Sequence, residues 1–199
     1  MDRRQEIIQT ASKLFLTRGY ENTSLNEIAK KTSITKGGIY HYFESKEHLL
    51  TAVINNVFDG IARYSESYFK DCQTPKEFFK MLFTSVEAMK GSSSEIFGES
   101  NPSVSGNFLP FFLSMAKKYP FVKKKTRVFA REIRTYFMKM FEELKDKGQL
   151  RNDIDIEAMS FEVHALMEGF FIISSLDDSL NMKDIGNRVF ENMWKRIER

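Results

Sequence analysis

The side chains best suited to chemistry lie between residues 24 and 46, and their types favour hydrogen bonding to a nucleic acid. Hydroxyl, ammonium, phenol and imidazole groups recur there, with a glycine that lets the backbone approach a partner: Ser24, Thr35, Lys36, Gly37, Tyr40, His41 and Lys46. Such groups bind phosphate oxygens and base edges in a major groove. We predict that Lys36 binds a guanine edge and that Tyr40 can touch a thymine methyl group. Phosphate contacts are expected from Ser24, Thr35, Tyr40, His41 and Lys46.

Two short helices must position these groups. Ser24 and Glu27 have the spacing of a capping box, which predicts a helix that starts at Ser24. Thr35 is placed to cap a second helix, in which Ile39 and Phe43 are four residues apart and face the core. The residues between the two helices break the apolar pattern. This arrangement predicts a helix-turn-helix whose second helix enters the major groove.

Three runs of residues extend this motif: Ile28-Ala29, Thr35 to Phe43, and Ser45 to Leu50. Together they resemble the DNA-binding signature of TetR-family transcriptional regulators. The resemblance implies an all-α fold with an N-terminal three-helix helix-turn-helix head, residues 1–46. A long helix would join this head to a C-terminal body for ligand binding and dimerisation, residues 47–199.

One position departs from the family's pattern. The turn between the two helices carries Ser33, where such proteins usually have glycine. A left-handed backbone conformation at this position would cost a non-glycine residue about 1 kcal/mol. We therefore expect either a strained serine or a turn of different geometry.

Apolar periodicity predicts helices along most of the chain. We expect them over residues 3–18, 46–70, 75–89, 107–118, 121–147, 155–176 and 182–198. The helix over 46–70 leaves no Gly/Pro/Ser linker between head and body, so movement at one end can reach the other. The helix over 107–118 is apolar almost all round and is expected to be buried or to line a cavity. Residues 91–106 have the composition of an ordinary surface loop, although a ligand gate is the alternative.

Composition limits the classes of protein and of partner. The net charge of +3 is too small to indicate a nucleic-acid partner by itself. The single cysteine, Cys72, excludes an intrachain disulfide and fits a reducing compartment. Without an apolar leader or a stretch of about 18 apolar residues, the sequence predicts a cytoplasmic protein with no membrane partner. Residues 117–151 hold 12 basic and 4 acidic side chains. We interpret them as a solvated helix face, with a second patch near DNA or an anionic-ligand site as alternatives.

Catalytic chemistry has little support. The three histidines, His41, His48 and His164, have no metal-ligand spacing. His164 and Glu168 are four residues apart and could share a metal, but a packing pair is the better interpretation. No glycine-rich phosphate loop is present in the sequence. We predict no enzymatic activity, no catalytic residue, no cofactor and no metal.

The resemblance also implies a ligand-responsive repressor that acts as a dimer. Aromatic and methionine side chains of the body suit an apolar ligand, and our pocket candidates are Phe83, Phe108, Phe112, Met115, Phe137 and Met140. The last two helices hold enough apolar surface for a subunit interface in addition to a core. We place this interface on Met159, Val163, Leu166, Met167, Phe170, Val189, Met193 and Trp194.

The sequence therefore predicts a homodimeric, all-α transcriptional regulator that represses from a palindromic DNA operator until a small hydrophobic effector releases it. Two alternatives stay open. One is a helical-bundle small-molecule-binding protein or enzyme that does not bind DNA, and the other is a protein–protein interaction module. Salt-dependent binding to duplex DNA separates the regulator from both, because phosphate contacts release counterions.

Overall fold

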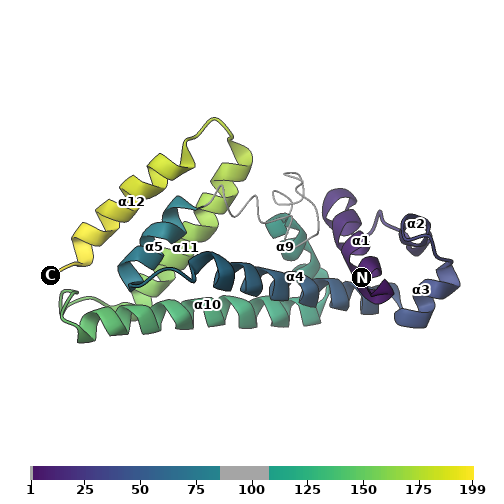
Figure 1. The fold of residues 1–199 in the computed structure, drawn as a ribbon, viewed down its shortest axis with the longest axis horizontal. Coiled ribbons are helices and arrows are strands. Elements are labelled where there is room, and N and C mark those ends of the chain that lie inside the picture. Colours follow the sequence, from purple (N-terminus) through teal and green to yellow (C-terminus); the bar gives the residue numbers. More distant parts are fainter. Residues whose placement is uncertain (1, 86–107) are drawn as a thin grey trace. The chain divides into compact units, whose positions relative to one another are not determined.

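The computed structural model describes residues 2–85 and 108–199, and within these two ranges the chain is α-helical with no β-strand (Figure 1). The helices are α1 (Arg3–Arg18), α2 (Leu25–Lys31), α3 (Lys36–Tyr42), α4 (Lys46–Phe69), α5 (Pro75–Thr84), α9 (Phe108–Lys118), α10 (Pro120–Asp146), α11 (Ile156–Leu176) and α12 (Met182–Ile197). The all-α prediction is confirmed. The expected loop over 91–106 and the part of the 75–89 helix after residue 85 lie outside the described residues.

Hydroxyl side chains fix where four of these helices begin. Each hydroxyl oxygen accepts a hydrogen bond from the backbone N–H three residues further on, at 3.0–3.2 Å: Ser24, Thr35, Ser45 and Thr74. A cap of this kind stabilises a helix by about 1 kcal/mol. Pro75 occupies the first turn of α5, where its missing N–H is not needed.

The described residues form two compact units, and helices α4 and α10 each continue from one unit into the other. The first unit holds residues 2–67 and 108–126, and the second holds residues 68–85 and 127–199. The functional boundary expected at 46/47 stays a prediction, because α4 begins at Lys46 and runs on through the first unit.

The first unit is built around the N-terminal half of α4. Helix α2 contacts both α1 and α3, and buried side chains from all of these helices meet. Fully buried large side chains of this core are Ile7, Phe15, Ile28, Ile39, Phe43, Leu49, Leu50 and Ile54. Helix α9 lies beside α1 (Figure 1), and its Phe112 ring packs on Phe58 with 5.0 Å between centroids. The head is thus stabilised by packing on α4 and α9, as its short helices require.

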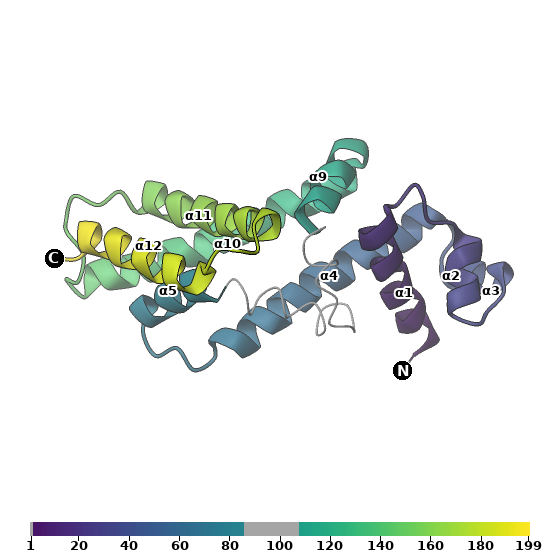
Figure 2. The same ribbon diagram turned by 90° about the horizontal axis from the view of Figure 1, so that it is seen from above.

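The second unit packs α5 against α11 and α12 (Figure 2). Phe79 of α5 stacks on Phe141 of α10, with 4.5 Å between ring centroids. Phe141 is fully buried, and its neighbour Met140 packs against the same core. Gly186 of α12 makes the closest approach, since a Cβ there would lie 2.0 Å from the backbone oxygen of Phe83.

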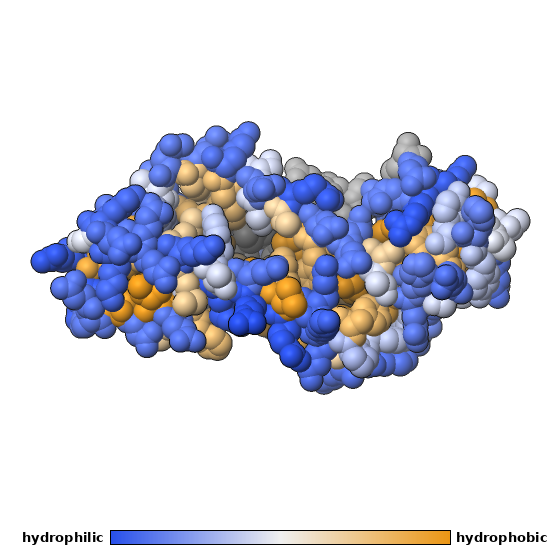
Figure 3. Space-filling model, turned by 90° about the horizontal axis from the view of Figure 1, so that it is seen from below, coloured by the Kyte–Doolittle hydropathy of each residue, from blue (hydrophilic) through white to orange (hydrophobic). Residues whose placement is uncertain are grey.

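Polar side chains cover most of the face in Figure 3, on which hydrophobic residues gather only in small patches. Helix α9 corrects one expectation: Leu113 is 57% exposed, while Phe111, Phe112 and Met115 are buried. An amphipathic helix on one unit has a single inward face, so all-round apolar composition did not mean all-round burial. No helix in the described part of the chain is long and apolar enough to cross a bilayer.

Candidate nucleic-acid interface

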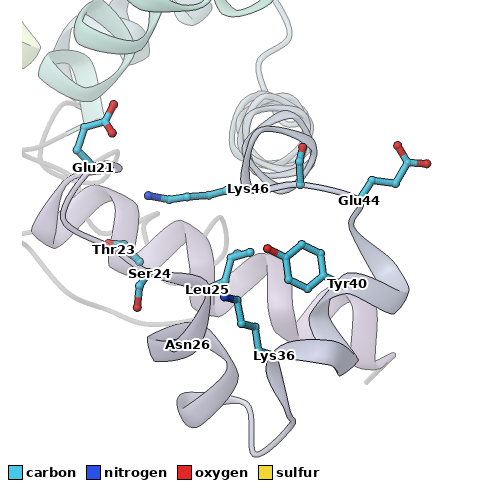
Figure 4. Close-up of a pocket in the computed structure, with 10 residues that line it drawn as sticks. Glu21, Thr23, Ser24, Leu25, Asn26, Lys36, Tyr40, Glu44 and Lys46 are labelled. Carbon is cyan, nitrogen blue, oxygen red and sulfur yellow. The ribbon is translucent and has the colours of Figure 1, made fainter.

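A groove on the first unit brings together residues from the α1–α2 loop, α2, α3 and the start of α4 (Figure 4). It is lined by Glu21, Thr23, Ser24, Leu25, Asn26, Lys36, Tyr40, Glu44, Ser45 and Lys46. Four of the seven side chains predicted to contact DNA are in this set: Ser24, Lys36, Tyr40 and Lys46. The other three, Thr35, Gly37 and His41, are exposed on or next to α3 but do not line the groove.

Helix α3 presents its polar side to this groove because its apolar side is anchored. Ile39 is fully buried, whereas Tyr40 is 46% exposed. Figure 4 shows Lys36 and Tyr40 projecting from α3 into the groove, and the Lys36 ammonium nitrogen lies 6.0 Å from the centre of the Tyr40 ring. The exposed side of α3 therefore offers a cation beside a phenol, groups that suit base edges and phosphates.

The turn that aims α3 is left-handed at Ser33, with φ of 54°. The backbone N–H of Ile34 donates to the Ala29 oxygen at 3.0 Å, and that of Thr32 donates to the Ile28 oxygen at 3.0 Å. These bonds close the end of α2 as a glycine-type helix terminus does. The strained serine is thus the correct one of the two expected alternatives, and the turn keeps the geometry that glycine would adopt.

Lys46 is directed into the first unit. Its ammonium group donates to the backbone oxygen of Tyr20 at 2.5 Å and lies 4.2 Å from the centre of the Tyr20 ring. Burial lowers the pKa of this ammonium group, and the nearby Glu21 carboxylate offsets part of that effect. The side chain joins α4 to the α1–α2 loop, so its expected phosphate contact stays a prediction.

Sequence reasoning missed two kinds of groove residue. Asn26 is exposed on the first turn of α2, and its position two residues after the Ser24 cap was the signal that could have identified it. Glu21 and Glu44 are carboxylates, which repel phosphates. Glu21 is ion-paired with Lys118 of α9. The hydrogen bond that the Lys118 ammonium group donates to the Glu21 carboxylate lowers the pKa of that carboxyl group.

The predicted ligand pocket is divided between the two units. Phe83 and Phe137 are buried in the core of the second unit, and Met140 packs against that core. Phe112 and Met115 are buried in the first unit, and the Phe108 side chain lies outside the description. Each described candidate therefore has core contacts, and a common pocket stays a prediction.

The predicted dimer interface stays a prediction, although its residues also have contacts within a single chain. Met159, Val163, Phe170, Met193 and Trp194 are at most 7% exposed within a single chain, and Leu166, Met167 and Val189 pack against the same core. Helix α11 is apolar on two faces, and periodicity could not tell which one faces inward. The exposed large apolar side chains of this helix are Phe161, Ile172, Ile173 and Leu176.

Residues able to bind a metal form a further class of candidate side chains. Within residues 2–85 and 108–199 no three His, Cys, Asp or Glu side chains form a possible metal cluster. The buried His164 ring lies 3.4 Å from an Arg134 nitrogen and 3.6 Å from a Glu168 oxygen. These contacts involve one side chain of α10 and two of α11.

A capped helix pair with a left-handed turn and an exposed Lys36–Tyr40 face defines a helix-turn-helix DNA-binding protein. Residues 7–53 match the family model described as "Bacterial regulatory proteins, tetR family". The chain belongs to the TetR family of transcriptional regulators and is a DNA-binding transcriptional regulator.

Relatives agree with this assignment over different lengths. The uncharacterized HTH-type transcriptional regulator YuxN of Bacillus subtilis is 53% identical over 53 residues, which are 27% of this chain and 18% of that protein. The HTH-type transcriptional repressor KstR2 of Mycolicibacterium smegmatis is 25% identical over 156 residues, 78% of this chain and 71% of that protein. The crystal structure of a TetR-family regulator from Cytophaga hutchinsonii shares the fold, with a TM-score of 0.82, 22% identity and coverage of 98% and 94% of the two chains.

Proposed function

We propose that this regulator is a repressor that binds a palindromic operator as a homodimer and leaves it when a small hydrophobic effector binds. The exposed Lys36–Tyr40 face of α3 is the observation that carries the DNA-binding part. The similarity to KstR2, which is named a transcriptional repressor, supports the sign of regulation.

In this proposal the side chains of the head have separate tasks. Lys36 lies at the start of α3 and binds a base edge, while Tyr40 binds a thymine methyl group or a phosphate. Ser24, Thr35 and His41 contact phosphates around the groove, and Gly37 lets the α3 backbone approach the DNA. Lys46 positions the head through Tyr20 and adds positive potential at the edge of the groove.

The homodimer is proposed to form through the outward face of α11. Phe161, Ile172 and Leu176 are 63%, 42% and 82% exposed, and they lie on one face at helical spacing with the exposed Ala165. A Cβ added to Gly169, on the same face, would meet nothing within 4 Å, so a partner helix can approach closely. A two-fold pairing of this face would replace the interface set first predicted.

The effector is proposed to be apolar because the body offers mainly aromatic and methionine side chains. Within the second unit, Phe83 and Phe137 are our candidates for its contacts. Melting temperatures measured with fatty acyl compounds and lipophilic cations test this part. A rise in melting temperature together with loss of operator binding supports it, and no response to any compound contradicts it.

Selection of bound duplexes from a random pool, followed by titration of the selected duplex at two salt concentrations, tests the DNA-binding part. We expect a palindrome whose half-sites are about one helical turn or a multiple of it apart. We also expect binding that weakens steeply with salt. No enrichment of any sequence would contradict the proposed operator.

A further inference from the structure

Five lysines gather where α9 ends and α10 begins, in a part of the first unit to which the proposed function gives no task. We name Lys117, Lys118, Lys123, Lys124 and Lys125 the lysine corner, and all five side chains are exposed. The sequence from residue 100 to residue 131 contains no Asp or Glu. The lysine corner therefore has no carboxylate close to it in sequence.

Only one of these lysines has an ion-pair partner among residues 2–85 and 108–199. Lys118 pairs with Glu21, and no carboxylate in those ranges lies within ion-pair distance of Lys117, Lys123, Lys124 or Lys125. Three adjacent like charges in the early turns of α10 are unfavourable for the helix itself. Apart from Glu21 at Lys118, the carboxylates of residues 2–85 and 108–199 thus leave the corner a positive surface.

The lysine corner borders the groove described above. Lys118 pairs with Glu21, which lines that groove. The next residue, Tyr119, packs edge-on against Tyr20 with 5.6 Å between ring centroids, and a side-chain hydrogen bond joins the two tyrosines. Both contacts lie within the first unit. They fix the end of α9 and the start of α10 against the loop that leads into α2.

The arrangement of the charges favours an extended anion over a compact one. Lys123, Lys124 and Lys125 are consecutive on a helix, so their side chains point in directions about 100° apart and cannot converge on one small ion. Val122 is buried beside them, which keeps these lysines on the outward side. A duplex offers phosphates spread along its length, which matches this distribution.

We propose that the lysine corner binds the phosphate backbone of DNA that flanks the half-site contacted by α3. This inference rests on the proposed function of the head. The contact is independent of base sequence, so it adds affinity and salt dependence and leaves sequence preference unchanged. Each chain of a dimer would contribute one corner, and the regulator would cover more DNA than its helix-turn-helix alone.

The test compares the wild-type protein with K123Q/K124Q/K125Q. The matched control is K139Q/K183Q/K195Q, which removes three exposed cations of the second unit. The probe is the duplex enriched from a random pool, used in a form trimmed to the selected sequence and in a form extended by about one helical turn at each end. Circular dichroism melting verifies that each variant is folded.

On the extended duplex we expect the slope of log K against log salt to become shallower by about 2 to 3 for K123Q/K124Q/K125Q, because each phosphate contact contributes about 0.9. The control should keep the wild-type slope, and the set of enriched sequences should be the same for all three proteins. An unchanged slope, or an equal change in the control, would overturn the proposal. If wild-type protein bound no duplex, the proposed function would fail as well, which is a distinguishable result.

Discussion

Gly186 of α12 faces the backbone carbonyl of Phe83 in α5 so closely that a Cβ at position 186 would lie 2.0 Å from the Phe83 oxygen. No side-chain movement can relieve a clash with backbone, so Gly186→Ala must separate the two helices. We expect this substitution to lower the free energy of unfolding by about 3 kcal/mol, at the upper end of overpacking costs.

Urea unfolding measures that loss, and Gly37→Ala is the control. A Cβ at position 37 would have its nearest neighbour at 3.8 Å, so alanine should stabilise α3 by up to about 1 kcal/mol. Equal stability of Gly186→Ala and the wild-type protein would mean that α5 and α12 are not packed as described.

Ser33 holds a positive φ angle that glycine adopts more easily. Ser33→Gly should therefore raise the free energy of unfolding by about 1 kcal/mol, while the hydrogen bonds of the turn remain. Ser33→Ala keeps the Cβ and should give no gain. Chemical denaturation of the wild-type protein, Ser33→Gly and Ser33→Ala measures the free energy of unfolding of each. A Ser33→Gly variant less stable than the wild-type protein would contradict the left-handed turn.

Tyr20 should make the first unit sensitive to alkali. Burial, and then its hydrogen bond with Tyr119, raise the pKa of its hydroxyl well above the ordinary value of 10.0. The folded state therefore keeps the proton when the unfolded state has lost it, and stability falls as the pH rises above about 10. Urea midpoints measured between pH 8 and pH 11 check this prediction. Tyr20→Phe should be less stable than the wild-type protein at pH 8, and its stability should fall less steeply above pH 10. If Tyr20→Phe lost stability above pH 10 as steeply as the wild-type protein, Tyr20 would not be the source of the alkaline loss.

Phe161 is 63% exposed on α11 and is proposed to pack across the two-fold axis. Phe161→Asp should raise the dimer dissociation constant at least tenfold, about 1.4 kcal/mol, without lowering the stability of the monomer. Sedimentation over a range of concentrations measures the constant. Lys195→Glu, on the exposed side of α12, is the charge control and should leave it unchanged. If Phe161→Asp and Lys195→Glu had the same dissociation constant, Phe161 would not lie in the dimer interface.

Lys36 is the side chain that we expect to determine sequence preference. Lys36→Ala should weaken binding to the preferred operator by about 1–3 kcal/mol and relax preference at one base pair of each half-site. Lys30→Ala removes an exposed cation of α2 that does not line the groove and should change neither quantity much. Competition with single-base operator variants measures both the affinity and the sequence preference. If Lys36→Ala weakened binding to all of these variants equally, Lys36 would contact a phosphate and not a base.

Local signals in the sequence predicted the helices and most of their ends. Ser24, Thr35 and Thr74 are followed three residues later by the N–H that they cap, and such a signal needs no tertiary information. The departure at Ser33 predicted either a strained serine or a different turn, and the φ angle of 54° identifies the strained serine.

Predictions that needed tertiary information were less accurate. Phe141 was not among the residues that the sequence indicated, and its stacking on Phe79 of another helix shows its place in the core. The hydrogen bond from Lys46 to the Tyr20 oxygen joins residues 26 apart in sequence, so sequence patterns alone could not predict it. For α11, both faces were apolar, so the inward one could be identified only once α5 and α10 were in place.

The pairing of the α1–α2 loop with the end of α9 sets the boundary at which this protein can be exchanged with a relative. A chimera joined at residue 46 would take Tyr20 and Glu21 from one parent and their partners Tyr119 and Lys118 from the other. The transplanted head would lose both contacts unless the donor body presented the same pair. A functional graft therefore needs two segments from one parent, the N-terminal stretch through residue 67 and the stretch from α9 to residue 126.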